Sequence, residues 1–339
     1  MRAAFLEAPK QLVIRETDDP VAPAGGLVIN VKAALTCGTD LKTYLRGHPK
    51  IPLPSPLGHE FSGVIDAIGE GVTEFAVGDQ VMAVHSAPCN ECFYCAQGLH
   101  NLCETIMDTK VLGAFADKIA LPAHITSQNV FPLPVELSFE KAAFLEPLAC
   151  VTHGLRVAGA EVGETAAVIG AGPIGLLFTA MLAAEGCAVF VVEPHEARRE
   201  AALTMGAHQA FDPEDDPLQQ IREITGGHGV DLVVECTGNE KVWQQAVGYV
   251  RRGGRVLLFG GPPADSEACF STARLHYDQI ALLGCFHFAP RDVAQAADLL
   301  SSGALDPTPL ITDTVSLEDL PETFEKLAKG EGIKVVVEP

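Results

Sequence analysis

The spacing of apolar residues changes in character along the chain. Over roughly the first 130 residues, short runs rich in β-branched and apolar residues are separated by glycine and proline, as at residues 27–33 and 61–68. Short strands bounded by turn residues are typical of all-β units. We therefore predict a β-rich, barrel-like region at the start of the chain.

A different pattern extends from about residue 164 to residue 284, where strand-length apolar runs alternate with helical stretches. Continuous apolar runs are typical of strands that are buried on both faces of a parallel sheet. We expect such strands at residues 166–169, 188–192, 230–234, 256–259 and 280–283, and helices at residues 174–185, 196–205 and 218–224. Alternation of this kind predicts an α/β, doubly wound parallel sheet. A further helix at residues 290–300 and a last strand at residues 334–337 complete the pattern.

Length and charge narrow the possibilities. A chain of 339 residues is longer than one core usually supports, which favours two domains. The formal net charge of -21 argues against nucleic acid and anionic membranes as partners, because both would be repelled. The charged start MRAAFLEAPKQLVIRE is unlike a secretory signal, and the uncharged stretch at residues 165–184 is interrupted by glycines and Pro173. A cytoplasmic protein without a membrane span is expected.

Four of the ten cysteines are clustered, as Cys89, Cys92, Cys95 and Cys103. Reduced cytosolic cysteines are better explained as metal ligands or buried thiols than as disulfides. Two-residue gaps allow successive thiolates to turn toward one centre, and four sulfurs fill the tetrahedral positions of zinc. We predict a closed structural zinc site that stabilises a loop and performs no chemistry.

A glycine-rich turn follows the first predicted strand of the α/β region. Its sequence is G-A-G-P-I-G, and it leads into a predicted helix. The residues are Gly170, Ala171, Gly172, Pro173, Ile174 and Gly175. The glycines allow close backbone approach to a pyrophosphate, and the helix N-terminus offers free N–H groups.

An acid, Glu193, ends the second predicted strand. A carboxylate at this place accepts hydrogen bonds from the adenosine ribose and repels a 2′-phosphate, which favours NAD over NADP. Arg198 and Arg199 lie close enough in sequence to keep NADP as an alternative.

A second set of metal-binding residue types is scattered along the chain. Cys37 begins C-G-T-D, His59 and Glu60 lie in L-G-H-E-F, and Glu146 lies in the apolar segment F-L-E-P-L. An unpaired buried carboxylate is costly, and a metal ion would offset that cost. One thiolate, one imidazole and one or two carboxylates leave a coordination position open, as catalytic zinc sites do.

These segments occur in the same order in the zinc-containing medium-chain dehydrogenases, and over essentially its whole length the chain resembles their sorbitol and threonine dehydrogenase branch. The resemblance implies a GroES-like catalytic domain formed by residues 1–147 and 289–339. It also implies a Rossmann domain at residues 148–288 that binds NAD, and a homotetramer or homodimer.

The resemblance also implies roles for single residues. Cys37, His59 and Glu60 match catalytic zinc ligands, with Glu146 either a ligand or a neighbour acting through water. Thr39 matches the hydroxyl that passes the substrate proton outward, and Asp40 a support of the ligands. Lys42 departs from the histidine that the family often has there. The expected contacts of the cofactor, beyond the glycine-rich turn, are Glu193, Arg198, Cys236 and Thr237.

The expected reaction is hydride transfer between NAD and a secondary alcohol of a polyol, sugar or sugar acid, giving a ketone. The alternatives are a threonine-type amino-alcohol dehydrogenase, an NADP-dependent alcohol or aldehyde reductase, and a catalytically silent NAD-binding scaffold. Tyr44, Phe115 and residues 286–288 are candidates for the substrate pocket or for the core. The basic residues that follow Cys37 indicate either an exposed loop or an anionic substrate, and they are Lys42, Arg46, His48 and Lys50.

Overall fold

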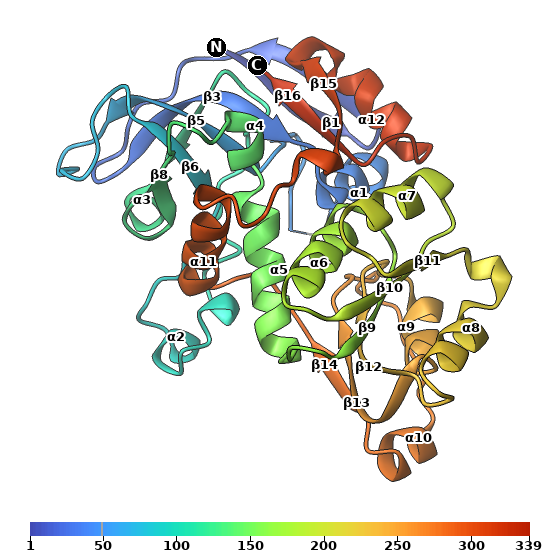
Figure 1. Cartoon of the computed structure of the whole chain (residues 1–339). Helices are drawn as coiled ribbons and strands as arrows, with labels where there is room; N and C mark the ends of the chain where they lie inside the picture. The colour runs from blue at the N-terminus through green and yellow to red at the C-terminus, as the bar shows by residue number, and fades with distance from the viewer. Residues whose placement is uncertain (49) are drawn as a thin grey trace. The chain divides into compact units, whose positions relative to one another are not determined.

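The computed structural model describes residues 1–48 and 50–339 (Figure 1). The chain forms two compact units, one consisting of Met1–Ala149 with His287–Pro339 and the other of Cys150–Phe286. The boundaries predicted from the sequence lie after residue 147 and before residue 289. Among the described residues, no helix is long and apolar enough to cross a membrane.

The first unit is built on two sheets. The larger has the strand order β15-β16-β3-β5-β6-β8, with β7 also paired to β3, and every pair except β15 with β16 is antiparallel. The smaller has the order β2-β1-β4. The strands are β1 (Arg2–Ala8), β2 (Gln11–Glu16), β3 (Leu27–Leu35), β4 (Ser55–Pro56), β5 (Glu60–Ile68), β6 (Gln80–Val84), β7 (Lys118–Leu121), β8 (Val130–Pro132), β15 (Ile311–Ser316) and β16 (Lys334–Glu338). The predicted β-rich start of the chain is therefore confirmed, and its sheet is completed by the C-terminal strands.

The core of this unit fills the space between these sheets and the helices that pack on them. It includes Leu27, Ile29, Phe61, Phe115 and Phe324, all fully buried. Each such side chain contributes about 1.5–3 kcal/mol through its removal from water. The helices are α1 (Gly38–Arg46), α2 (Phe93–Ala96), α3 (Ala123–Asn129), α4 (Phe139–Ala142), α11 (Pro290–Ser301) and α12 (Leu320–Ala328), with short 3-10 turns η1 (His100–Leu102), η3 (Thr308–Leu310) and η4 (Leu317–Asp319).

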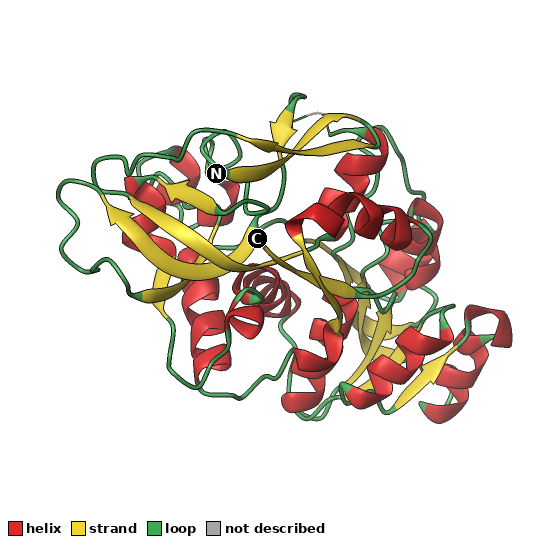
Figure 2. Ribbon diagram, turned by 90° about the horizontal axis from the view of Figure 1, so that it is seen from above, coloured by secondary structure: helices red, strands yellow, loops and turns green. Residues whose placement is uncertain are grey.

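The second unit is a parallel sheet with helices, as the alternating pattern predicts. Its strand order is β11-β10-β9-β12-β13-β14, and every pair is parallel (Figure 2 draws the strands in yellow). The strands are β9 (Thr165–Ile169), β10 (Ala188–Val192), β11 (Gln209–Phe211), β12 (Val230–Glu235), β13 (Val250–Leu258) and β14 (Ala281–Gly284). The helices are α6 (Pro173–Ala184), α7 (Glu196–Thr204), α8 (Pro217–Ile224), α9 (Glu240–Ala246) and α10 (Thr272–Tyr277), with the 3-10 turn η2 (Pro213–Asp215).

Local sequence explains both the agreement and the misses. Gly206 has a φ of 98° just after α7, and this left-handed conformation is the expected glycine stop of a helix. Helix α5 (Leu145–Ala158), which carries the chain from the first unit into the second, was not predicted, because Pro147 and Gly154 interrupt its helical pattern. Strand β13 begins six residues earlier than expected, at Val250, because the polar segment R-R-G-G-R hides its first half.

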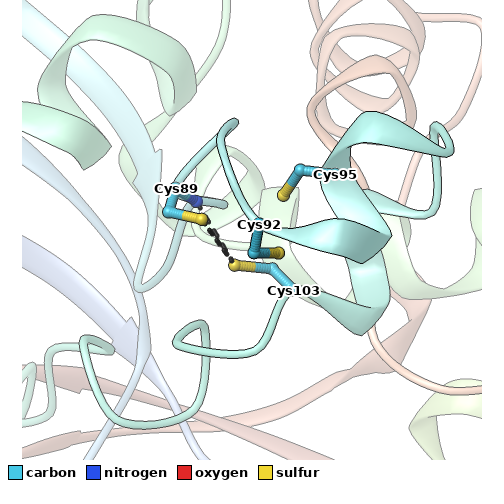
Figure 3. Close-up of side chains that lie close together, drawn as sticks. All are labelled: Cys89, Cys92, Cys95 and Cys103. Atoms are coloured by element: carbon cyan, nitrogen blue, oxygen red, sulfur yellow. Dashed lines mark hydrogen bonds between the residues drawn. The ribbon is translucent and has the colours of Figure 1, made fainter.

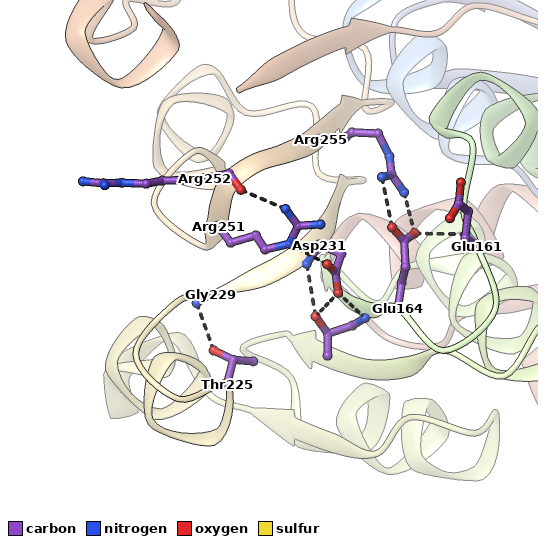
Figure 4. Close-up of polar contacts among 9 residues, drawn as sticks. Glu161, Glu164, Thr225, Gly229, Asp231, Arg251, Arg252 and Arg255 are labelled. Atoms are coloured by element: carbon purple, nitrogen blue, oxygen red, sulfur yellow. Dashed lines mark hydrogen bonds and ion pairs between the residues drawn. The ribbon is translucent and has the colours of Figure 1, made fainter. Parts of the chain in front are cut away.

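An ionic network connects the beginnings of three neighbouring strands of the parallel sheet (Figure 4). One carboxylate oxygen of Asp231 in β12 accepts hydrogen bonds from the backbone N and the hydroxyl of Thr165 in β9, both at 2.7 Å, and the other pairs with Arg251 of β13 at 2.5 Å. Arg255 of β13 binds both oxygens of Glu164, at 3.0 and 2.5 Å. Charged side chains thus connect neighbouring strands at the end of the sheet where each strand starts.

Candidate metal and cofactor sites

The four predicted catalytic metal ligands come from three parts of the first unit. Cys37 precedes α1 as its N-cap, His59 directly precedes β5, Glu60 is the first residue of β5, and Glu146 lies in the first turn of α5. The potential ligand atoms of His59, Glu60 and Glu146 lie within 4.8 Å of one another, as do those of Cys37, Asp40 and His59. Residues that are far apart in the sequence therefore meet around His59.

The imidazole of His59 is buried and held by Asp40, whose carboxylate lies 3.2 Å from Nδ1. Burial alone would lower the pKa of His59, but the charges of Asp40 and Cys37 outweigh it and raise the pKa well above its usual value. An imidazole that is oriented by a carboxylate through one nitrogen is the arrangement found at metal-ligating histidines. The expected support role of Asp40 matches this contact.

Glu60 has a buried partner that the sequence analysis did not identify, namely Lys334 at the start of β16. The Lys334 ammonium and the Glu60 carboxylate form an ion pair, and both side chains are at most 1 % exposed. Burial alone would lower the pKa of Lys334, but the charge of Glu60 outweighs this effect and the pKa is raised. The only sequence signal was a lysine at the head of the apolar strand K-V-V-V-E.

The residues present fit a divalent cation. Oε1 of Glu60 and Oδ2 of Asp40 are buried and have no hydrogen-bond partner within the described part of the chain. Buried carboxylate oxygens of this kind are costly unless they are hydrogen-bonded or bind a metal. Thiolate, imidazole and carboxylate together are a donor set that suits zinc.

Two histidines border this centre. His85 was not predicted, whereas His287 lies within residues 286–288, which were candidates for the substrate pocket or for the core. His85 follows β6, is buried, and packs edge-on against His59 with ring centroids 5.1 Å apart. Its Nδ1 lies 3.6 Å from Oε1 of Glu146. His287, with a φ of 61°, hydrogen-bonds the hydroxyl of Ser86 at 2.7 Å and stacks on Phe288. Burial, followed by the charges of His59 and His287, lowers the pKa of His85 well below its usual value, so its ring is neutral.

The proposed pocket aromatics divide between core and surface. Tyr44 and Phe115 are buried and both pack against Phe324 of α12, with ring centroids 5.2 and 6.1 Å apart, so they belong to the core. Phe286 is 48 % exposed, whereas Phe288 is buried. Sequence alone could not separate these cases, because each is an aromatic residue in an apolar context.

The four clustered cysteines converge on one point in the loop that contains α2 (Figure 3). Their sulfur atoms all lie within 4.8 Å of one another, and Sγ of Cys103 lies 3.5 Å from Sγ of Cys89. No cysteine in the described residues forms a disulfide. Burial raises the pKa of Cys103, but the backbone N–H of Cys89 and the contacts with Thr105 outweigh it and lower the pKa to about 6. A thiolate is therefore available at neutral pH, as a structural zinc site requires.

The glycine-rich turn connects β9 with α6 in the second unit. Gly170 has a φ of 94°, which a side chain rarely adopts, and a Cβ on Gly175 would overlap the carbonyl oxygen of Gly170. Gly172 is the N-cap of α6, has an ordinary φ of -71°, and a Cβ there would meet nothing within 4 Å. The backbone conformation of Gly170 and the close packing at Gly175 explain these two glycines. Gly172 instead leaves open space in front of the N-terminus of α6.

Glu193 lies against this turn, directly after β10. Its carboxylate is buried and accepts hydrogen bonds from the backbone N of Ala171 at 2.7 Å and of His195 at 3.1 Å. Arg199 binds Asp212 and the carbonyl oxygens of Glu193 and Pro194 at 2.7–2.8 Å. Arg198 is half-buried on α7.

Cys236 and Thr237 follow β12 at the end of the sheet that carries the glycine-rich turn. The buried carboxylate of Glu235 accepts hydrogen bonds from the hydroxyl and the backbone N of Thr237, the latter at 2.7 Å. Burial raises the pKa of Cys236 well above its usual value, so its thiol stays protonated. This favours a packed thiol over a reactive one.

Each unit of the chain contains a region that matches a known protein family. Residues 23–134 match the alcohol dehydrogenase GroES-like domain, and residues 173–302 match the zinc-binding dehydrogenase domain. The chain is therefore a zinc-containing medium-chain dehydrogenase, closest to the polyol and threonine branch, with a GroES-like domain and a Rossmann-type domain.

Three relatives each match more than nine-tenths of the chain. It is 33 % identical to the sorbitol dehydrogenase of Bacillus subtilis (strain 168), over 100 % of this chain and 97 % of the relative. It is 30 % identical to the L-galactonate-5-dehydrogenase of Escherichia coli (strain K12), over 96 and 95 %. It is 34 % identical to an L-threonine 3-dehydrogenase of Caldanaerobacter subterraneus subsp. tengcongensis, over 92 and 91 %.

A solved structure supports the same fold. A protein of Sinorhizobium meliloti 1021 that is described as a zinc-binding dehydrogenase, with NADP bound, is 29 % identical. It superposes with a TM-score of 0.91 over 100 % of this chain and 99 % of that chain.

Proposed function

We propose that this dehydrogenase oxidises a secondary alcohol of a polyol or sugar-type substrate to a ketone, with zinc and NAD. The observation that carries the proposal is the set of possible ligands around the buried His59. The half-buried thiol of Cys37 lies within 4.8 Å of it in one group, and the buried carboxylates of Glu60 and Glu146 do so in a second. The names of the sorbitol and galactonate relatives support the substrate class.

In this proposal Cys37, His59 and a carboxylate of Glu146 or Glu60 hold the catalytic zinc. When bound, zinc makes a coordinated hydroxyl group more acidic, and NAD takes up the hydride. Asp40 fixes the ring of His59, and Lys334 balances the charge of Glu60 inside the protein. Thr39, exposed in the first turn of α1 and next to Cys37, is the hydroxyl we expect to take the substrate proton outward.

We also propose that the enzyme prefers NAD to NADP. Glu193 places a buried negative charge against the glycine-rich turn, where the adenosine ribose binds in this class of fold. Arg199 is already engaged by Asp212 and two carbonyl groups, which limits its ability to neutralise a 2′-phosphate. The NADP bound to the Sinorhizobium protein supports the opposite choice, so both cofactors belong in the test.

Other parts of the proposal rest on the resemblance. Cys89, Cys92, Cys95 and Cys103 hold a second, structural zinc, and the convergence of their sulfur atoms supports this role. A homotetramer or homodimer is expected, and light scattering after gel filtration measures it. The cytoplasmic location stays a prediction.

The decisive experiment is a substrate panel followed by NADH or NADPH absorbance. Polyols, sugar acids and amino alcohols are each offered to the zinc-loaded enzyme with NAD and with NADP. We expect turnover of secondary alcohols of polyol or sugar type with NAD. Threonine as the preferred substrate would instead support the second candidate, which the threonine dehydrogenase relative favours. Turnover of none of these alcohols would overturn the proposal.

A further inference from the structure

The imidazole of His85, beside the candidate zinc centre, is packed against three other aromatic rings. Its ring centroid lies 5.1 Å from that of His59, 5.6 Å from that of His287 and 6.0 Å from that of Phe288, and each of these contacts is edge-on. The backbone N–H of Val111 donates a hydrogen bond to the carbonyl oxygen of His85 at 2.8 Å. The residue is only 6 % exposed, so its ring has little room to turn.

His287, one of these three rings, adopts a backbone conformation that is rare for residues with a side chain. Its φ of 61° lies in the left-handed region, which costs free energy unless the surroundings hold it. Its Nε2 forms a hydrogen bond with the hydroxyl of Ser86 at 2.7 Å, and its ring stacks on Phe288 with centroids 4.0 Å apart. Asn129 also donates a hydrogen bond to the carbonyl oxygen of Ser86 at 2.7 Å. The segment that carries His85 is therefore held by several contacts.

One nitrogen of this fixed ring faces a carboxylate. Nδ1 of His85 is buried, has no hydrogen-bond partner within the described part of the chain, and lies 3.6 Å from Oε1 of Glu146. A buried polar atom without a partner is costly. A hydrogen bond needs about 2.7–3.2 Å, so a shift of roughly half an ångström completes the contact. Because an ionised carboxylate only accepts, Nδ1 is the nitrogen that donates the hydrogen in such a bond.

We propose that His85 is a positioning residue, which orients the carboxylate of Glu146 at the metal centre through a hydrogen bond from Nδ1. The inference rests on the proposed function. It favours Glu146 over Glu60 as the carboxylate that meets the metal ion, because Glu60 is already paired with Lys334. Glu146 offers a ligand atom within 4.8 Å of those of His59 and Glu60. A carboxylate held by a fixed imidazole loses less freedom when it binds a metal ion, and partners of this kind contribute about 10- to 100-fold to metal affinity.

The test measures the affinity of the open metal site rather than turnover. With zinc kept in the four-cysteine site, Co²⁺ is titrated against a chelator and followed by the visible absorption of the bound ion. His85→Phe keeps the aromatic packing and removes the N–H group, so Kd for Co²⁺ should rise by roughly 10- to 100-fold. His85→Asn places an amide N–H near the position of Nδ1 and should recover most of the affinity, whereas His85→Gln, whose amide reaches the position of Nε2, should not. Unchanged affinity in His85→Phe, or recovery by glutamine but not by asparagine, would overturn the inference.

A double-mutant cycle assigns the effect to Glu146. In a Glu146→Gln background, His85→Phe should change the Co²⁺ affinity by less than about twofold, because the carboxylate that His85 orients is gone. Losses that simply add would show that His85 acts by another route, and they would overturn the inference.

The matched control is His124→Phe. His124 lies in α3 of the same unit, and its Nε2 is likewise buried without a hydrogen-bond partner among the described residues. This variant should keep the wild-type Co²⁺ affinity, and an equal loss in both histidine variants would contradict a specific role of His85. Wild-type enzyme that binds no metal beyond the four-cysteine site would overturn the proposed function and this inference with it. Unchanged affinity in His85→Phe overturns the inference alone.

Discussion

At the scale of single residues, the candidate zinc centre is a set of buried charges that neutralise one another. Asp40 contacts His59, and Lys334 is paired with Glu60. A buried pair is costly to form and costlier to break, because the remaining partner keeps its charge without compensation. The stability of the first unit therefore depends on these partner residues as well as on the proposed ligands.

Replacement of Lys334 should therefore be strongly destabilising. Lys334→Met leaves the carboxylate of Glu60 buried without its partner, and we expect the free energy of unfolding to fall by about 3–5 kcal/mol. Urea unfolding of the zinc-loaded protein measures the change. The double variant Lys334→Met with Glu60→Gln should recover part of the loss, and Lys32→Met should behave as wild type. A single variant as stable as wild type would mean that the pair carries no energetic weight.

The proposed ligands could be picked out from the sequence, but some of their neighbours could not, and the reason is physical. Cys37, His59, Glu60 and Glu146 are chemically distinctive in their local segments, so pattern and resemblance identified them. No local pattern records the roles of Lys334 and His85, because these roles depend on contacts made across the fold. Tyr44 and Phe115 show the converse, since their apolar contexts fit a pocket and a core equally well until packing decides.

At the scale of elements, the turn between β9 and α6 contains glycines that the fold requires and one glycine that is free to serve a ligand. Gly170 and Gly175 are required by the backbone itself, whereas Gly172 has an ordinary φ and open space around it. The three-glycine spacing and its place between strand and helix were predictable, because both follow from local sequence. Which glycine serves the fold and which serves a ligand was not, because that depends on the neighbouring atoms.

Gly172→Ala should consequently affect cofactor binding and leave folding almost unchanged. An added methyl group meets no protein atom within 4 Å, so the thermal midpoint should stay within a few degrees of wild type. The same methyl group would obstruct a pyrophosphate at the start of α6, and we expect Kd for NAD to rise by ~10-fold or more. Fluorescence titration of NADH measures the affinity. Wild-type affinity in this variant would remove the pyrophosphate from this turn.

The ionic network at the other end of the parallel sheet gives a pH-dependent prediction. Burial raises the pKa of Asp231, but Thr165 and Arg251 outweigh it and the pKa is lowered. A carboxyl group with a depressed folded pKa contributes stability above its unfolded pKa of about 3.9, and this contribution is lost as the pH falls through the folded value. Asp231→Asn should reduce the free energy of unfolding by about 1–3 kcal/mol at pH 7, because the hydrogen bonds are to a charged group.

The control for this change is Asp265→Asn, at an exposed position of the same unit. Chemical unfolding of the three proteins from pH 7 down to pH 3 should show the difference between wild type and Asp231→Asn narrowing as the pH falls. A difference that is constant over this range would show that hydrogen-bond geometry, and not charge, stabilises the junction of β9, β12 and β13.

At the scale of the whole molecule, the two halves of the proposed chemistry lie in different units. The residues proposed to hold zinc all belong to Met1–Ala149, and those proposed to bind NAD all belong to Cys150–Phe286. The division was predictable because the change from short β-runs to alternating strands and helices is visible in the sequence. The return of the last strands to the first sheet came from the resemblance, since β16 carries no local signal of its partner β3.

This division predicts that metal and cofactor binding can be separated by single substitutions. By mass spectrometry of the native protein we expect two zinc ions per chain, one closed site and one open site. Cys37→Ala should retain one zinc ion, lose turnover by at least ~100-fold, and keep its affinity for NAD within about twofold, because its lesion lies outside the NAD-binding unit. Cys95→Ala should instead impair folding, since a structural zinc contributes to the stability of its loop. Exposed Cys269 provides the control, and Cys269→Ala should keep both metal ions and full activity. Near-normal turnover of Cys37→Ala with a single zinc ion would show that the open site is not where the alcohol is oxidised.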